Sequence, residues 1–133
     1  PALIDTVPQA EIKAYSLETV VAEKFHAMIV LSLANSRMKD FFDVYRILVT
    51  DKVDDEILPE AIRFTFANRG TGYRENHPLF TEEFFASKDR QSFWKGFLRK
   101  IKYSEIIEFQ TVGLLIKDRL QPYWESLRDD SIL

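Results

Sequence analysis

Apolar residues recur at helical spacing along most of this chain, and that periodicity constrains the fold more than any other feature of the sequence. It is clearest between residues 38 and 49, where the charged residues fall on the side opposite the apolar ones. The apolar stripe consists of Met38, Phe41, Phe42, Tyr45, Leu48 and Val49. Because residues three and four apart share one face of a helix, this segment predicts an amphipathic helix.

The same spacing, together with capping residues, predicts helices on both sides of that segment. Ser, Thr and Pro are favoured where helices begin, and Gly where they end. The expected helices cover residues 17–34, 38–49, 59–69, 82–86, 89–101 and 105–121. Their expected terminal residues are Ser16, Asn35 or Ser36, Pro59, Thr81 and Ser104, with Gly70 ending the third helix. Pro122 is expected to stop or kink the last helix, with one more turn over residues 123–127.

The fold class that follows is mainly α. The chain has only 4 Gly and 5 Pro in 133 residues, which argues against a loop-rich or sandwich architecture. We therefore expect a single domain over residues 1–133, a compact bundle of five to six helices. A short extended segment, residues 1–14, precedes the first helix.

Charge and cysteine content exclude several classes of protein. The net charge of −3 gives no case for a nucleic-acid surface across the whole chain, although it leaves local basic clusters open. The absence of Cys excludes disulfides and thiolate metal sites. No apolar run reaches the length of a membrane span and no signal peptide is visible, so we expect a cytoplasmic protein with no membrane partner.

One lysine interrupts the apolar stripe of the first expected helix. Lys24 falls in the middle of that stripe, and an unpaired buried ammonium costs on the order of several kcal/mol. The stripe consists of Leu17, Val20, Val21, Ala27, Met28 and Leu31. Lys24 must therefore reach solvent, pair with a structural carboxylate, or face a ligand such as a phosphate or carboxylate.

Two aspartates on the next helix are the other candidates for chemistry. Asp40 and Asp43 are neighbours on its polar face, where they could hold a divalent metal or supply a general base. Lys39 pairs with Asp43 at helical spacing, so a solvated ion-paired face is an equally good interpretation for Asp43. Asp40 has no such partner at that spacing. Arg37, in the turn between the helices, is a candidate phosphate contact or a solvated turn residue.

Geometry weighs against a direct bridge between Lys24 and Asp40. In a simple antiparallel hairpin their offset along the helix axes is roughly 10 Å. The helical wheel also places Asp40 opposite the apolar stripe of its own helix. A ligand of triphosphate size between the two side chains is the better expectation.

The remaining candidates have structural interpretations. Glu23 and His26 are expected at the surface, because they are too few for a zinc site. His77, beside Pro78, is expected to be structural, and the aromatic set Phe93, Trp94 and Phe97 is expected in the core. No Gly-rich phosphate loop, nucleophile elbow or paired-histidine metal motif is present.

Two blocks carry a recognisable pattern: Ala22-Glu23-Lys24, within residues 15–28, and Arg37-Met38-Lys39-Asp40, within residues 35–43. Together with residues 61–66, 69–71 and 93–98, they resemble the AbiEii/AbiGii toxin family of nucleotidyltransferases. These proteins are the toxin halves of abortive-infection and type IV toxin–antitoxin systems. The resemblance covers most of the chain.

The resemblance implies a role for each candidate residue. Lys24 matches a lysine that contacts nucleotide phosphates, and Asp40 matches an aspartate of the catalytic centre. Arg37 and Asp43 match flanking positions that we assign to substrate binding. The implied reaction transfers a nucleotide from an NTP, with Mg²⁺, to an acceptor such as tRNA, and a cognate antitoxin is an implied partner.

The sequence departs from the family in one respect. The Gly-Ser motif and the Asp-x-Asp metal pair of the nucleotidyltransferase core have no match here. We therefore expect the C-terminal helical part of an α+β protein, which has no metal site of its own, is inactive alone and needs an upstream core. The alternatives are a non-catalytic helical module that binds an antitoxin or another part of its own chain, and a purely structural bundle.

Overall fold

The computed structural model describes residues 16–130. Within that range the chain forms six α-helices, two short 3₁₀ helices and no strand, which confirms the expected helical bundle. The helices are α3 (Leu17–Leu31), η1 (Ser32–Ala34), α4 (Met38–Val49), α5 (Ile57–Asn68), η2 (Pro78–Phe80), α6 (Glu82–Ala86), α7 (Lys88–Lys100) and α8 (Phe109–Asp130). The extended segment expected at residues 1–14 lies outside the described residues.

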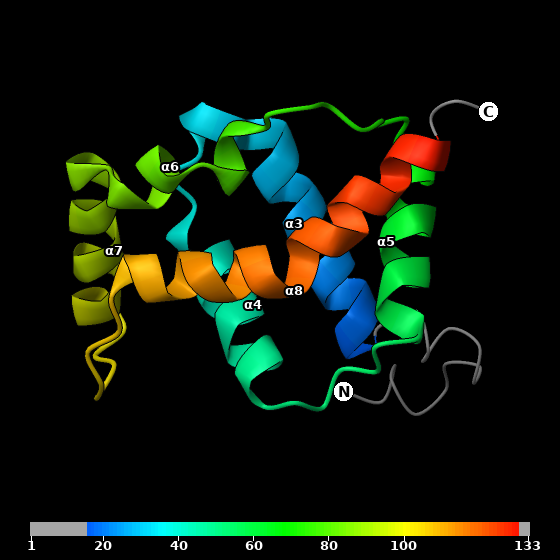
Figure 1. The fold of residues 1–133 in the computed structure, drawn as a ribbon. Coiled ribbons are helices and arrows are strands. Elements are labelled where there is room, and N and C mark those ends of the chain that lie inside the picture. The colour runs from blue at the N-terminus through cyan, green and yellow to red at the C-terminus, as the bar shows by residue number, and fades with distance from the viewer. Residues whose placement is uncertain (1–15, 131–133) are drawn as a thin grey trace.

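The helices pack around α8, which crosses the front of the bundle in Figure 1. Helix α3 packs against α4 and α5, and α7 stands at the opposite end of the molecule from α5. Helix α8 contacts α4, α5, α6 and α7. Within residues 16–130, each helix is too short or too polar to cross a bilayer.

Several of the expected helix ends are confirmed. The Ser16 hydroxyl accepts a hydrogen bond from the Thr19 amide at 3.3 Å, as an N-cap should. Gly70 ends α5 with a φ of +67°, and the next amide, of Thr71, donates to the Phe66 carbonyl at 2.9 Å. That bond, with a left-handed glycine before it, is typical of a helix C-terminus.

Other helix ends differ from the prediction. Helix α4 begins at Met38 without a side-chain cap, because Asn35 accepts from the Arg37 amide instead, at 2.7 Å. Helix α5 begins at Ile57, ahead of Pro59.

The prediction for the last helix is wrong at its start, because α8 begins at Phe109 rather than directly after Ser104. At its other end α8 continues through Pro122 to Asp130, which excludes a stop at the proline and extends beyond the one further turn expected over residues 123–127. An interior proline costs about 3 kcal/mol. Burial of Trp124 and Leu127, both beyond Pro122, offsets that cost.

Aromatic residues fill the core on both sides of α8. On the α5 side, Phe25 contacts Phe66 and Trp124, with ring centroids 5.6 and 6.4 Å apart. On the α7 side, Phe41 contacts the rings of Phe84, Phe85 and Phe109.

Phe93 is an error of the sequence prediction, because its side chain is 52% exposed. Helix α7 packs along a narrow face that buries Trp94 and Leu98. Phe93 lies about 100° around the helix from Trp94 and so points away from the bundle.

Candidate functional site

Five side chains from α3, from α4 and from the residue just before α4 meet in one ionic cluster. Lys24 Nζ lies 3.0 Å from Asp43 Oδ2 and 3.4 Å from Asp40 Oδ1. Arg37 Nε lies 3.2 Å from the other Asp40 oxygen, and Lys39 Nζ lies 2.6 Å from Asp43 Oδ2. All four residues predicted as site residues from the sequence, Lys24, Arg37, Asp40 and Asp43, therefore share one place in the fold.

The direct contact between Lys24 and Asp40 corrects the expected offset of the two helices. Their connection is not a tight hairpin turn, because η1 and the residues up to Arg37 continue past the end of α3. The chain then returns so that the first turn of α4 lies beside the middle of α3. Two charges that are 16 residues apart in sequence thereby come within hydrogen-bonding distance.

The burial of Asp40 is a second correction. Its side chain is only 5% exposed, although the helical wheel placed it on the polar side of α4. That face is covered by α3, which the wheel of a single helix does not include. Asp40 also has the helical-spacing partner that the sequence reasoning missed, because Arg37 lies one turn before it.

The position of Lys24 is also different from the expected one. The buried face of α3 consists of Glu18, Val21, Ala22, Phe25, His26, Met28 and Ile29. Lys24 lies at the edge of this face, with its side chain 25% exposed. The structure thus favours a lysine paired with carboxylates, one of the alternatives left open by the sequence, while its ammonium still reaches the surface.

Electrostatics keep this cluster charged. Burial lowers the pKa of Lys24, but the hydrogen bonds and charges of Asp43 and Asp40 outweigh it and hold the pKa above its ordinary value. Burial raises the pKa of Asp43, but Lys39 and Lys24 outweigh it and hold that pKa below its ordinary value. Lys24 is therefore a cation, and Asp43 an anion, throughout the neutral pH range.

The cluster borders a surface hollow of about 570 Å³. This exceeds the hollow of about 410 Å³ between α6 and α8. The ionisable side chains lining the larger hollow are Glu23, Lys24, His26, Arg37, Asp40 and Arg69. Three cations, Lys24, Arg37 and Arg69, therefore face one space.

The wall opposite α4 was not identified from the sequence. Arg69, at the end of α5, donates to Glu23 at 2.6 Å. His26 was expected at the surface but is only 9% exposed, and its Nε2 hydrogen-bonds the Thr71 hydroxyl at 2.8 Å. Burial lowers the pKa of His26, and Arg69 adds to this effect, so the imidazole is neutral. Only the packing of α5 on α3 reveals these partners.

The carboxylates of this site do not fit a metal ion. Among residues 16–130, no group of three or more Asp, Glu or His side chains is arranged to hold one. Lysine ammonium groups already lie against both carboxylates, with Lys24 beside Asp40 and Asp43 and Lys39 beside Asp43. An Mg²⁺ ion at this position would have to displace Lys24.

The comparison with protein families decides what kind of protein this is. The family model described as the nucleotidyl transferase AbiEii toxin of type IV toxin–antitoxin systems matches residues 1–125. The chain belongs to the AbiEii family. The resemblance carried by the two sequence blocks is thereby confirmed, and Lys24, Arg37, Asp40 and Asp43 lie within the matched range.

No curated protein and no solved structure gave a significant match to the chain. The AbiEii family therefore supplies the general activity, nucleotidyl transfer by a toxin. The roles of individual residues depend on the geometry of the cluster and its hollow.

Proposed function

We propose that this chain is the helical, phosphate-binding part of a nucleotidyltransferase toxin that transfers a nucleotide from an NTP to an acceptor such as tRNA. In this proposal Lys24 contacts the nucleotide phosphates and Arg37 assists it. Asp40 belongs to the catalytic centre, and Asp43 holds Lys24 in place. The observation that carries the proposal is the meeting of these four side chains beside a hollow of about 570 Å³.

The cations of the cluster retain capacity for an anionic ligand. An ammonium carries three donors, and Lys24 directs them to only two carboxylates while a quarter of its side chain stays exposed. Arg37 is 61% exposed and meets Asp40 through Nε, which leaves the fork of its guanidinium for a phosphate. A phosphate in the hollow could therefore accept charge-assisted hydrogen bonds from Lys24 and Arg37.

Asp40 is unusually buried for a residue of a catalytic centre. Its Oδ2 is buried and accepts no hydrogen bond from the described residues, and Arg37 is the cation that faces it. In the proposed role at the catalytic centre, Arg37 keeps its Nε beside the buried Asp40 while the fork of its guanidinium meets the ligand.

Mg²⁺ and the nucleotidyltransferase core are assigned elsewhere in this proposal. Since the carboxylates of the cluster do not fit a metal, Asp40 and Asp43 do not act as Mg²⁺ ligands in this proposal. We assign the ion and the Gly-Ser and Asp-x-Asp motifs to a core outside residues 1–133. A cognate antitoxin is the proposed partner of the whole toxin, in keeping with the family description.

The test uses the full-length protein and a pair of matched lysines. Lys24→Met should abolish growth inhibition in cells, whereas Lys39→Met should leave it intact, because Lys39 is 71% exposed and meets Asp43 from the solvent side. Both variants lose one charge from the same cluster. Growth inhibition that survives Lys24→Met would contradict the proposal and favour a non-catalytic interaction module.

A double variant separates a structural role of Lys24 from a functional one. Lys24→Met alone leaves Asp40 without one of its cations, so its thermal stability falls. Lys24→Met/Asp40→Asn removes both charges and should recover part of that stability. Growth inhibition should stay absent in the double variant. Recovery of growth inhibition together with stability would show that Lys24 acts only on the fold.

A further inference from the structure

The strongest charge asymmetry in this chain lies far from the Lys24 cluster, on α7 and the turn after it. Residues 88–102 contain six Lys or Arg and one Asp. The rest of the chain contains twelve Lys or Arg and twenty Asp or Glu. A strongly basic segment is therefore embedded in an otherwise acidic protein.

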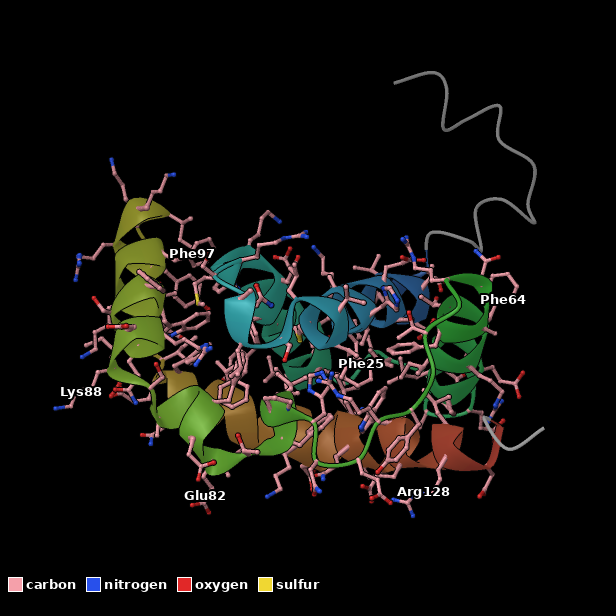
Figure 2. The ribbon with its side chains drawn as sticks, turned by 90° about the horizontal axis from the view of Figure 1, so that it is seen from above. Phe25, Phe64, Glu82, Lys88, Phe97 and Arg128 are labelled. Atoms are coloured by element: carbon pink, nitrogen blue, oxygen red, sulfur yellow. The ribbon has the colours of Figure 1, made fainter. Side chains whose placement is uncertain are left out.

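The cations of this segment form a row on its outer face. Lys88, Lys95 and Arg99 are seven and then four residues apart, so they lie on one line along the helix. The row from Lys88 to Arg99 is about 17 Å long. All three are exposed, whereas Trp94 and Leu98 on the other side are buried. Figure 2 shows Lys88 directed away from the bundle. Lys100 and Lys102 extend the basic surface around the end of the helix.

These cations differ from others in the protein because they are not neutralised. Within residues 16–130, no carboxylate forms an ion pair with any of the three residues of the row. Lys24, Lys39 and Arg69, by contrast, each hold a carboxylate. Favourable interaction with the helix dipole accounts for cations in the last turn only, and Lys88 lies at the first residue of α7.

Two further features belong to the exposed surface of α7. Phe93 exposes 52% of its surface about 120–160° around the helix from the row, on the same line as Lys100. A hollow of about 420 Å³ lies at the C-terminal end of the helix, lined by Lys95, Arg99 and Lys102 and also by Glu105 and Glu108. A row of cations with an exposed aromatic ring is the usual composition of a surface that follows a nucleic-acid backbone and stacks on a base.

We propose that the outer face of α7, formed by Lys88, Phe93, Lys95, Arg99, Lys100 and Lys102, binds the phosphate backbone of a nucleic acid. Charge complementarity selects this ligand. A membrane surface fits less well, because Trp94 and Leu98 of α7 are buried against the bundle and the exposed side offers a single aromatic ring, Phe93, rather than an apolar stripe.

The position of the basic face also suits an acceptor strand. Helix α4 lies between α3 and α7, since Asp43 meets Lys24 on one side while Phe42 contacts the Phe97 ring on the other. Two helix spacings of about 8–10 Å each separate the basic face from the Lys24 cluster. Use of this face to hold the acceptor rests on the proposed function, whereas the binding itself does not.

Binding of a labelled RNA hairpin, and of its DNA counterpart, to the 133-residue chain without NTP tests the inference directly. Lys95→Gln/Arg99→Gln should weaken binding about tenfold or more near 100 mM salt. The slope of the logarithm of the binding constant against the logarithm of the salt concentration should become less steep by about two. The control is Lys52→Gln/Lys117→Gln, which removes the same charge from exposed positions elsewhere. This control should bind like the unaltered chain.

Each outcome of this test has one meaning. Loss of binding only in the α7 variant supports the inference, and preference for the RNA or the DNA hairpin identifies the nucleic acid. Equal binding by all variants, or equal weakening in both, would overturn it. Equally tight binding of a polyglutamate peptide would also overturn it, in favour of an acidic protein partner. Because no NTP is present, failure here leaves the Lys24 proposal untouched.

Discussion

Gly113 of α8 lies directly against the ring of Phe85 of α6. A β-carbon at Gly113 would come within 2.4 Å of Cγ of that ring, which is closer than any real contact of this kind. Phe85 cannot simply move aside, because it is buried and packs on Phe84 and Phe109. The absence of a side chain at Gly113 is therefore what allows α6 and α8 to approach.

This contact predicts opposite effects of two glycine substitutions. Gly113→Ala should destabilise the protein by about 1–3 kcal/mol through overpacking, even though alanine favours helix. Gly96→Ala, in α7, should stabilise it by about 0.5–1 kcal/mol, because nothing lies within 4 Å of the added carbon. Urea unfolding of both variants measures the difference. Equal changes would mean that Phe85 and α8 are not packed as described.

His77 predicts a pH dependence of stability near neutrality. Its Nε2 must donate to the Ile29 carbonyl at 2.8 Å, and its Nδ1 accepts from the Leu79 amide at 3.0 Å, so the ring is neutral in the fold. Burial lowers its pKa more than the bond to Ile29 raises it. Stability is thus present above the unfolded pKa of about 6.5 and falls by up to about 1.4 kcal/mol at one pH unit below it.

Two variants test this assignment. His77→Asn keeps an acceptor for Leu79 but leaves the Ile29 carbonyl, at the end of α3, without its partner. We expect it to lose about 1–3 kcal/mol and much of the pH dependence. His26→Gln should retain the contribution of His77. Urea unfolding midpoints at about pH 7.5 and pH 5.5 give the comparison. If His77→Asn loses as much stability between these two pH values as the unaltered protein does, the assignment is contradicted.

Asp43 predicts a separate loss of stability in acid. Lys39 and Lys24 hold its folded pKa below the unfolded value, so its contribution is present above about pH 3.9 and is lost as the pH falls through the folded pKa. Asp43→Asn should cost about 1 kcal/mol at neutral pH, because the ion pairs are partly exposed. The difference between this variant and the unaltered protein should narrow below about pH 4. A constant difference would exclude the ion pairs as its origin.

Truncation of Phe25 and of Phe93 should affect stability very differently, because one ring is buried and the other is mostly exposed. Phe25 is fully buried among Phe66, Phe80 and Trp124, so Phe25→Ala should cost about 3–5 kcal/mol. Phe93→Ala should change stability by less than about 0.5 kcal/mol, because its ring lies mostly in solvent. Thermal unfolding distinguishes them. A large loss in Phe93→Ala would show that α7 is rotated from the orientation described.

The sequence predicted what depends on neighbours along the chain. The bounds of α4, the start of α3 and the C-terminal end of α5 follow from apolar spacing, from Ser16 and from Gly70. The start of α8 was not predictable in this way, because Trp94 of α7 donates to the Ile107 carbonyl at 2.6 Å and holds that stretch out of the helix. That hydrogen bond connects two different elements.

The candidate site shows the same division. The residue types and their positions on α3 and α4 were predicted from the sequence, and all four residues meet. Their direct contact was not predicted, because the path of residues 32–37 sets the offset between the helices. The wall formed by Arg69 and His26 depends on how α5 packs against α3, which no local pattern contains.

Helix α8 joins regions that would otherwise have separate cores. It extends about 33 Å, and it places Phe109 against the rings of Phe85 and Trp94 but Trp124 against the ring of Phe66 in α5. Neither region can lose its packing without exposing one end of the same rod. We therefore expect the slowest-exchanging backbone amides near α7 and near α5 to become accessible to solvent in one concerted opening, so that the protein melts as a single cooperative unit.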